Sequence, residues 1–285
     1  MSATSAITDR STPATELVGN PHHGAGASFL TTASGTATRT VLQFFRTPQL
    51  LFMGTIQGAL FLFMFRYVFG RAISSGGALI YVDFMVPGFI VTVILWTGMS
   101  ASAGVAEDAA TGLYDRLRSL PIPRAAVVFG RASADTALVA WGLLVTGTLG
   151  FILGFRAHGG ADGFVAGMLL TVVAGFAFTW VFIYIGLVAG NAQAAQGLSM
   201  LVIPFSFVSA ANVPVTTMPG WMQPFAANQP VTVVINAVRS LMQGGTDTVG
   251  IEHTTGYWVG LSLVWCAGIA LVFAALSVAR FSRTK

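Results

Sequence analysis

The chain has 285 residues, of which 54% are hydrophobic and 8% are charged, and its mean hydropathy is +0.75. A soluble domain of this length carries charge on about a quarter of its residues, so the composition excludes a soluble globular protein and indicates that lipid surrounds most of the chain. The formal charge is +4, but no run of basic residues is interleaved with aromatic ones. This pattern argues against nucleic acid as a partner.

The first part of the chain is rich in Ser, Thr, Ala, Gly and Pro. Such a composition has too few apolar residues to build a core, so we expect a flexible tail over residues 1–36 and a membrane domain over 37–285. From Ala37 to Phe45, apolar residues recur at helical spacing between Arg39 and Arg46. This pattern is typical of a helix that lies in the membrane interface.

Six apolar segments follow, and a transmembrane helix needs roughly 20 such residues. The third segment is longer than one crossing requires, and the fifth is short. The sequence therefore predicts an all-α membrane protein with six transmembrane helices. The segments cover about 49–69, 84–106, 124–154, 164–190, 198–211 and 255–279.

The segment between the second and third spans, residues 107–121, has carboxylates at its start and arginines near its end, as a helix dipole favours. Leu113, Leu117 and Leu120 recur at the spacing of one helix face, and Pro121 ends the pattern. A short amphipathic helix at the cytoplasmic surface would suit the docking of a soluble partner. An ordinary charged loop has the same features, so periodicity alone leaves both interpretations open.

Residues 212–245 resemble neither a span nor a soluble loop, because prolines separate their apolar stretches. We expect a broken fifth span followed by short external helices that re-enter the outer leaflet. Non-helical backbone survives at membrane depth only where protein buries it or where it lines a cavity. The prolines are Pro214, Pro219, Pro224 and Pro230.

Basic residues accumulate on the cytoplasmic side of membrane proteins. With the N-terminus inside, ten of the fourteen basic residues fall on or near the cytoplasmic face, so we expect both termini in the cytoplasm. The four on the outer side are Arg66, Arg71, Arg156 and Arg239.

The chain lacks the means to use ATP itself, because a P-loop needs a lysine after its glycines and the only lysine is Lys285. An antiporter driven by an ion gradient would need acids deep in the spans. Asp135 is the one carboxylate expected there, and Arg131 four residues earlier is placed to pair with it. Such an antiporter, or a membrane anchor that transports nothing, remains an alternative.

Other candidate sites are few. Cys266 stands alone, and no metal-ligand cluster or nucleophile–base pair is present in the sequence. Four apolar side chains in or near spans could line a substrate path, although such residues usually pack against helices or lipid. They are Trp96, Met200, Phe205 and Phe207.

Two motifs resemble a known family, the ABC-2 type permeases, over the chain from about residue 40 to its end. Within that family they are most similar to the daunorubicin/doxorubicin-resistance (DrrB-like) exporters of actinobacteria. The first motif comprises Glu107 to Gly112, Asp115-Arg116-Leu117, Ser119-Leu120-Pro121-Ile122-Pro123-Arg124, Gly130-Arg131 and Asp135. The second comprises Met218-Pro219-Gly220-Trp221, Asn228-Gln229-Pro230 and Arg239.

The resemblance implies a permease of the bacterial inner membrane that exports hydrophobic drugs or lipid-like molecules. It implies an interfacial helix, six spans and a coupling helix that fits into a separate ATPase subunit. Two ATPase subunits, which bind ATP and Mg²⁺, and two permease subunits, identical or paralogous, would form the working assembly among membrane lipids. This chain would hold no cofactor. The expected coupling residues are Glu107, Asp108, Gly112, Leu113, Asp115, Arg116, Leu117, Arg118, Leu120 and Pro121.

Overall fold

The computed structural model describes residues 28–47, 56, 58–69, 81–249 and 251–283, and all regular secondary structure within these ranges is helical. The all-α prediction is therefore confirmed for the described part of the chain. Most of the expected N-terminal tail and more than a third of the first expected span, residues 49–55 and 57, lie outside these ranges.

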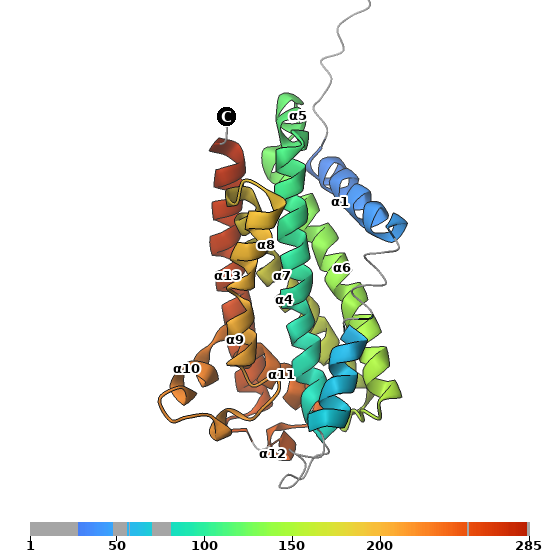
Figure 1. The fold of residues 1–285 in the computed structure, drawn as a ribbon, viewed down its shortest axis with the longest axis vertical. Helices are drawn as coiled ribbons and strands as arrows, with labels where there is room; N and C mark the ends of the chain where they lie inside the picture. The colour runs from blue at the N-terminus through green and yellow to red at the C-terminus, as the bar shows by residue number, and fades with distance from the viewer. Residues whose placement is uncertain (1–27, 48–55, 57, 70–80, 250, 284–285) are drawn as a thin grey trace, which may run out of the picture.

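Four helices in the described ranges are long and apolar enough to cross a membrane: α4 (Tyr81–Ala110), α6 (Arg124–Ile152), α7 (Gly160–Val188) and α13 (Thr255–Arg283). They stand together as a bundle (Figure 1). A helix of 29 residues is about 43 Å long, which exceeds the roughly 30 Å of the hydrocarbon core. These helices match the second, third, fourth and last expected spans. The helix Gly58–Val68, which runs into the π-helical turn η1 (Phe65–Phe69), is the described part of the first.

The bundle has two distinct ends (Figure 1). The short helix α5 (Leu113–Ser119) and the C-terminus of α13 lie at one end, which we call the α5 end. The helices α10 (Gln223–Asn228) and α12 (Thr246–Val249) lie at the other, which we call the α10 end.

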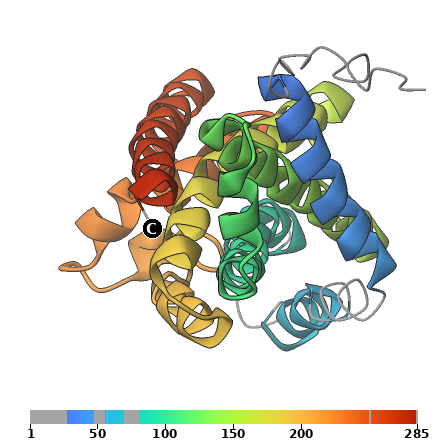
Figure 2. The same ribbon diagram turned by 90° about the horizontal axis from the view of Figure 1, so that it is seen from above.

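The helix α1 (Phe29–Arg46) lies against the outside of α6, on the side of the molecule away from α13 (Figures 1 and 2). It begins eight residues before Ala37, because the Ser28 hydroxyl accepts a hydrogen bond from the Thr31 N–H and caps the first turn. The two helices approach closely at Gly130 of α6, where a Cβ would clash with the Ala33 carbonyl oxygen.

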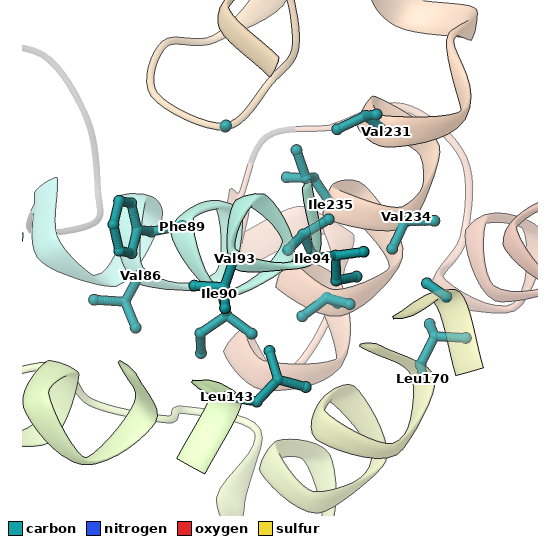
Figure 3. Packing of buried hydrophobic residues seen from close by; sticks show 14 of the residues in the cluster. Val86, Phe89, Ile90, Val93, Ile94, Leu143, Leu170, Val231, Val234 and Ile235 are labelled. Carbon is teal, nitrogen blue, oxygen red and sulfur yellow. The ribbon is translucent and has the colours of Figure 1, made fainter. Parts of the chain in front are cut away.

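The hydrophobic core lies where α4, α6, α7 and α11 (Pro230–Gln243) meet (Figure 3). Although α11 has only 14 residues, nearly all of its side chains are buried. Because it is too short to span a bilayer, its apolar residues fill the bundle instead. The labelled core residues of Figure 3 are Val86, Phe89, Ile90, Val93, Ile94, Leu143, Leu170, Val231, Val234 and Ile235.

Residues 198–211, the expected fifth span, contain the end of α8 (Ala192–Met200) and all of α9 (Ile203–Phe207), with a break in the helix between them. The chain then reaches the 3-10 turn η2 (Val215–Thr217). Polar side chains of α11 and of its N-cap residue, Gln229, bind the backbone around the break after α9, residues 205–211. The Gln229 amide donates to two of its carbonyl oxygens, both at 3.0 Å, and the Thr232 hydroxyl accepts one of its N–H groups at 3.2 Å. Arg239 donates to the Ala210 carbonyl oxygen at 2.7 Å. Protein side chains therefore satisfy this irregular backbone, and its last three residues, 209–211, are buried.

Candidate functional site

The segment between α4 and α6 divides into two helices at Gly112. α4 continues to Ala110 and α5 begins at Leu113, because Gly112 adopts φ = 71°, a left-handed conformation that suits glycine. Glu107 and Asp108 therefore lie in the last turn of α4. The prediction that one helix starts at these carboxylates is wrong, and the dipole argument for it is reversed, since a helix C-terminus favours cations.

Four charged side chains from three helices form an ion cluster beside this turn: Arg39 of α1, Asp108 of α4, and Arg131 and Asp135 of α6. Arg131 donates to the Asp108 carboxylate at 2.8 Å and to the Asp135 carboxylate at 2.9 Å. Arg39 donates to the other oxygen of Asp108 at 3.3 Å. The ion cluster thus joins α1, α4 and α6 next to the point where α5 leaves α4.

The Arg131 guanidinium lies in a gap that α4 provides. Its third nitrogen donates to the Ala101 carbonyl oxygen at 3.2 Å, and a Cβ on Gly104 would lie 2.8 Å from that nitrogen. The Arg131 and Asp135 side chains are only 10% and 1% exposed. Removing one partner of a buried ion pair costs about 3–5 kcal/mol, because the remaining charge loses its compensation. We infer that the ion cluster fixes the positions of α4 and α6 relative to each other.

Local spacing predicted only part of this ion cluster. The Arg131–Asp135 pair follows from the i, i+4 relation on one helix and is confirmed. The sequence predicts a partner contact for Asp108 and places Arg39 only at the flank of the interfacial helix. Their contacts join residues 23 and 69 positions apart in sequence, and only the packing of α1, α4 and α6 brings them together.

Besides Asp135, one further carboxylate is buried within the described span-length helices, and it lies one residue before the expected start of the second span. α4 begins at Tyr81, and the buried Asp83 in its first turn accepts the backbone N–H of Arg156 at 2.7 Å. His158 lies 3.9 Å from the same carboxylate. Within the described ranges, no group of three or more His, Cys, Asp or Glu side chains is placed to hold a metal ion.

One side of α5 faces the chain's own helices. Tyr114 is buried, and Leu113 and Leu117 are partly buried in the same apolar cluster. Burial raises the pKa of the Tyr114 phenol well above its usual range, so the ring stays neutral. Leu120 departs from this face, since α5 ends at Ser119 and the backbone then becomes extended. Its side chain is 52% exposed.

The other side of α5 is exposed. Asp108, Gly112, Leu113 and Leu117 are only partly exposed, and the Arg118 side chain, 15% exposed, is directed to the end of α13. The coupling role of all ten predicted residues stays a prediction. The five of them that are exposed are Glu107, Asp115, Arg116, Leu120 and Pro121.

The four predicted substrate-path residues occupy two kinds of position. Trp96 of α4 is partly buried between the rings of Phe61 and Phe89, with centroid separations of 4.9 and 5.4 Å, so packing accounts for its place. Met200, Phe205 and Phe207 are exposed on α8 and α9. Their role in transport stays a prediction.

Comparisons with known proteins agree with the resemblance in the sequence. Residues 36–242 match the model of the family described as ABC-2 type transporter. The chain is 35% identical over 260 residues to the daunorubicin resistance ABC transporter permease protein DrrB1 of Streptomyces coeruleorubidus, covering 90% of this chain and 88% of that protein.

Two mycobacterial proteins are also similar. The doxorubicin resistance ABC transporter permease protein DrrB of Mycobacterium tuberculosis (strain ATCC 25618 / H37Rv) is 25% identical over 211 residues, covering 74% of this chain and 72% of that protein. The probable doxorubicin resistance permease DrrC of the same strain is 31% identical over 163 residues, covering 57% of this chain and 56% of that protein.

Proposed function

This chain belongs to the ABC-2 type transporter family, and we propose that it exports hydrophobic drugs or lipid-like molecules across the bacterial inner membrane. It is a permease subunit homologous to those of drug-resistance ABC exporters. The substrate class is proposed from the printed names of these relatives. ATP and Mg²⁺ would act through a separate ATPase, and the permease would expose a shared cavity to each side in turn.

The proposed topology places the α5 end in the cytoplasm. Basic residues favour that side, and among the described ones three are expected on the outer side, Arg66, Arg156 and Arg239, against the five at the α5 end. The helix Gly58–Val68 would belong to the first of six spans, α8 with α9 would form the broken fifth, and α10 with α11 would re-enter from outside. The arginines at the α5 end are Arg116, Arg118, Arg124, Arg280 and Arg283.

A second permease subunit, a copy or a paralogue, would complete the substrate cavity. Met200, Phe205 and Phe207 are exposed on α8 and α9, and the uncharged polar side chains of Gln193 and Gln196 are exposed beside them on α8. Lipid tails offer no hydrogen bonds to such amides, so this face suits a cavity or another subunit better than lipid.

The observation that carries the coupling role is the position of α5 between a partner-accessible surface and the ion cluster. The exposed side chains of Asp115, Arg116 and Leu120 can contact an ATPase, while the turn at Gly112 joins α5 directly to α4. Arg131 then joins α4 to α6. A displacement of α5 would therefore reach two spans without passing through a flexible connection.

The test uses the full chain co-expressed with its partner ATPase, sought first in the neighbouring reading frame. Leu120→Asp puts a charge into the proposed dry contact, where an uncompensated charge commonly costs several kcal/mol, and each 1.4 kcal/mol is about tenfold in affinity. We expect recovery of the ATPase with the permease, and export of doxorubicin from cells, to fall by tenfold or more.

The matched control is Trp221→Asp, which changes an exposed apolar side chain at the α10 end. It should leave ATPase recovery unchanged. Undiminished recovery with Leu120→Asp would contradict docking at α5. Doxorubicin retention that is the same with and without the ATPase would contradict export of this drug.

A further inference from the structure

The last carbonyl groups of α13 are bound by arginines from elsewhere in the chain. The final four carbonyls of an α-helix have no partner within the helix, and cations are favoured there. The Nε of Arg118 in α5 donates to the Phe281 carbonyl oxygen at 3.0 Å, and Arg124 at the start of α6 donates to that of Ser282 at 3.1 Å. Both arginines follow the turn at Gly112, so the segment after α4 is attached to the last span.

Ring contacts strengthen this attachment. The Phe281 side chain is buried, and the Tyr114 ring of α5 meets it edge-on with centroids 5.3 Å apart. The Arg118 guanidinium carbon lies over the same ring, 4.6 Å from its centroid, which is the geometry of a cation–π contact. We call the set formed by Tyr114, Arg118 and Phe281 the α5–α13 contact.

Arg118 and Arg116 face in different directions although they are two residues apart on one helix. Positions two apart on an α-helix differ by about 200° around its axis. Arg116 is exposed, whereas Arg118 is 15% exposed and its second donor pairs with Asp115 at 2.8 Å, a carboxylate that is 71% exposed. Arg118 is therefore held toward α13 and has little surface left for a partner.

We propose that Arg118 is a positioning residue that attaches α5 to the end of α13, so that a displacement of α5 moves the last span together with α4 and α6. This inference rests on the proposed function, because the ATPase would supply the displacement. The ion cluster connects the end of α4 to α6 and α1, and the α5–α13 contact reaches the opposite side of the molecule (Figure 2). Together the two sets would distribute one motion over the whole bundle.

The first measurement follows distances between spin labels in the complex of the full chain with its ATPase. Cys266 is the only cysteine, so Cys266→Ala provides the background. Labels at Ser119→Cys and Arg283→Cys, both at exposed positions, should give one narrow distance that is the same without nucleotide and after trapping with ATP and vanadate. A distance that changes on trapping would show that α13 does not follow α5 and would overturn the proposal.

A second label pair shows whether α5 moves at all. Ser119→Cys with Trp221→Cys, an exposed position at the α10 end outside the helices that the proposal moves together, should report a changed distance on trapping. An unchanged distance would overturn the proposed coupling function and this inference with it. A change in this pair combined with a change in the first pair overturns the inference alone.

Matched variants separate positioning from partner contact. Arg118→Gln should broaden the distance between labels 119 and 283 and lower doxorubicin export per ATP hydrolysed by about five- to tenfold, while ATPase recovery stays normal. Arg116→Gln should do the reverse, lowering recovery and leaving the distance narrow. Equal loss of recovery in both variants would identify Arg118 as a partner contact and overturn the proposal.

Phe281→Leu provides a second route if Arg118→Gln does not reach the membrane. This change keeps the backbone carbonyl that Arg118 binds and removes both ring contacts. We expect a smaller broadening of the same distance, with ATPase recovery unchanged. A distance distribution identical to that of the parent chain would overturn the proposal.

Discussion

The Arg131 guanidinium compensates the charges of two carboxylates from two helices. Its third nitrogen donates to the Ala101 carbonyl oxygen. Such a planar, forked donor suits this arrangement better than a lysine ammonium, which acts as a point charge. Because Asp135 is almost fully buried, its charge depends on Arg131 far more than the charge of Asp108 does.

Replacing Arg131 tests how much the ion cluster stabilises the permease. Arg131→Met keeps a long apolar side chain but leaves Asp135 buried without a partner, so the free energy of unfolding should fall by about 3–5 kcal/mol. Arg131→Met combined with Asp135→Leu should recover part of this loss, because the orphaned charge is removed too. Thermal unfolding of the purified chain in detergent measures both, and a double variant no more stable than the single one would contradict the explanation.

The helix α11 combines two faces with different partners. Its apolar side chains fill the core (Figure 3), while buried polar side chains recur at i, i+3, i+7, i+10 and i+14, counted from the N-cap residue Gln229. Residues at this spacing share one face of a helix. Side chains of that face donate hydrogen bonds to backbone carbonyl oxygens in the break after α9 and at the start of α4. The polar residues are Gln229, Thr232, Asn236, Arg239 and Gln243.

Among the residues of this face, replacement of Arg239 should disturb the break after α9 most. Its guanidinium donates to the carbonyl oxygens of Ala210 and Phe84 and lies 3.8 Å from the centroid of the Phe84 ring. Arg239→Met removes these donors, so the chain around Ala210 should loosen. In a Cys266→Ala background, Ala210→Cys should react slowly with a thiol reagent when Arg239 is present and at least several-fold faster with Arg239→Met.

The control for this experiment is Arg239→Lys, which keeps a charge and some donors but loses the planar fork. Its reaction rate should fall between the other two. Equal rates in all three chains would show that Arg239 does not hold the break closed.

The elements were predictable where a single local pattern decides them. Length and hydropathy predicted the four long helices, and the prolines predicted that residues 212–245 form short helices instead of one span. Periodicity placed Leu120 on the face of Leu113 and Leu117, but α5 ends before it, and a residue beyond a helix end no longer follows the helical phase. The division at Gly112 had a sequence signal, since glycine commonly takes the left-handed position at a helix end.

The two ends of the molecule differ in how they are held together. At the α5 end, charged side chains link separate helices through the ion cluster and through the arginines on α13. At the α10 end, the polar contacts of α11 are mainly hydrogen bonds to backbone, including that of the Gln243 amide to the Asp83 carbonyl oxygen at 2.9 Å. These long-range contacts could not be read from sequence, because each needs two helices to be docked first. Charged links between helices at the α5 end suit the proposed function, in which an ATPase displaces the helices from that end.

The orientation of these ends in the membrane determines whether the α5 end can meet an ATPase at all. In a Cys266→Ala background, a cysteine at Ser119 should resist an impermeant thiol reagent added to intact cells, because the basic α5 end is expected inside. A cysteine at Glu252, exposed at the α10 end, should react under the same conditions. Permeabilised cells supply the control, since both positions should then react. Ready labelling of Ser119→Cys in intact cells would reverse the topology and place the proposed docking surface out of reach of any cytoplasmic partner.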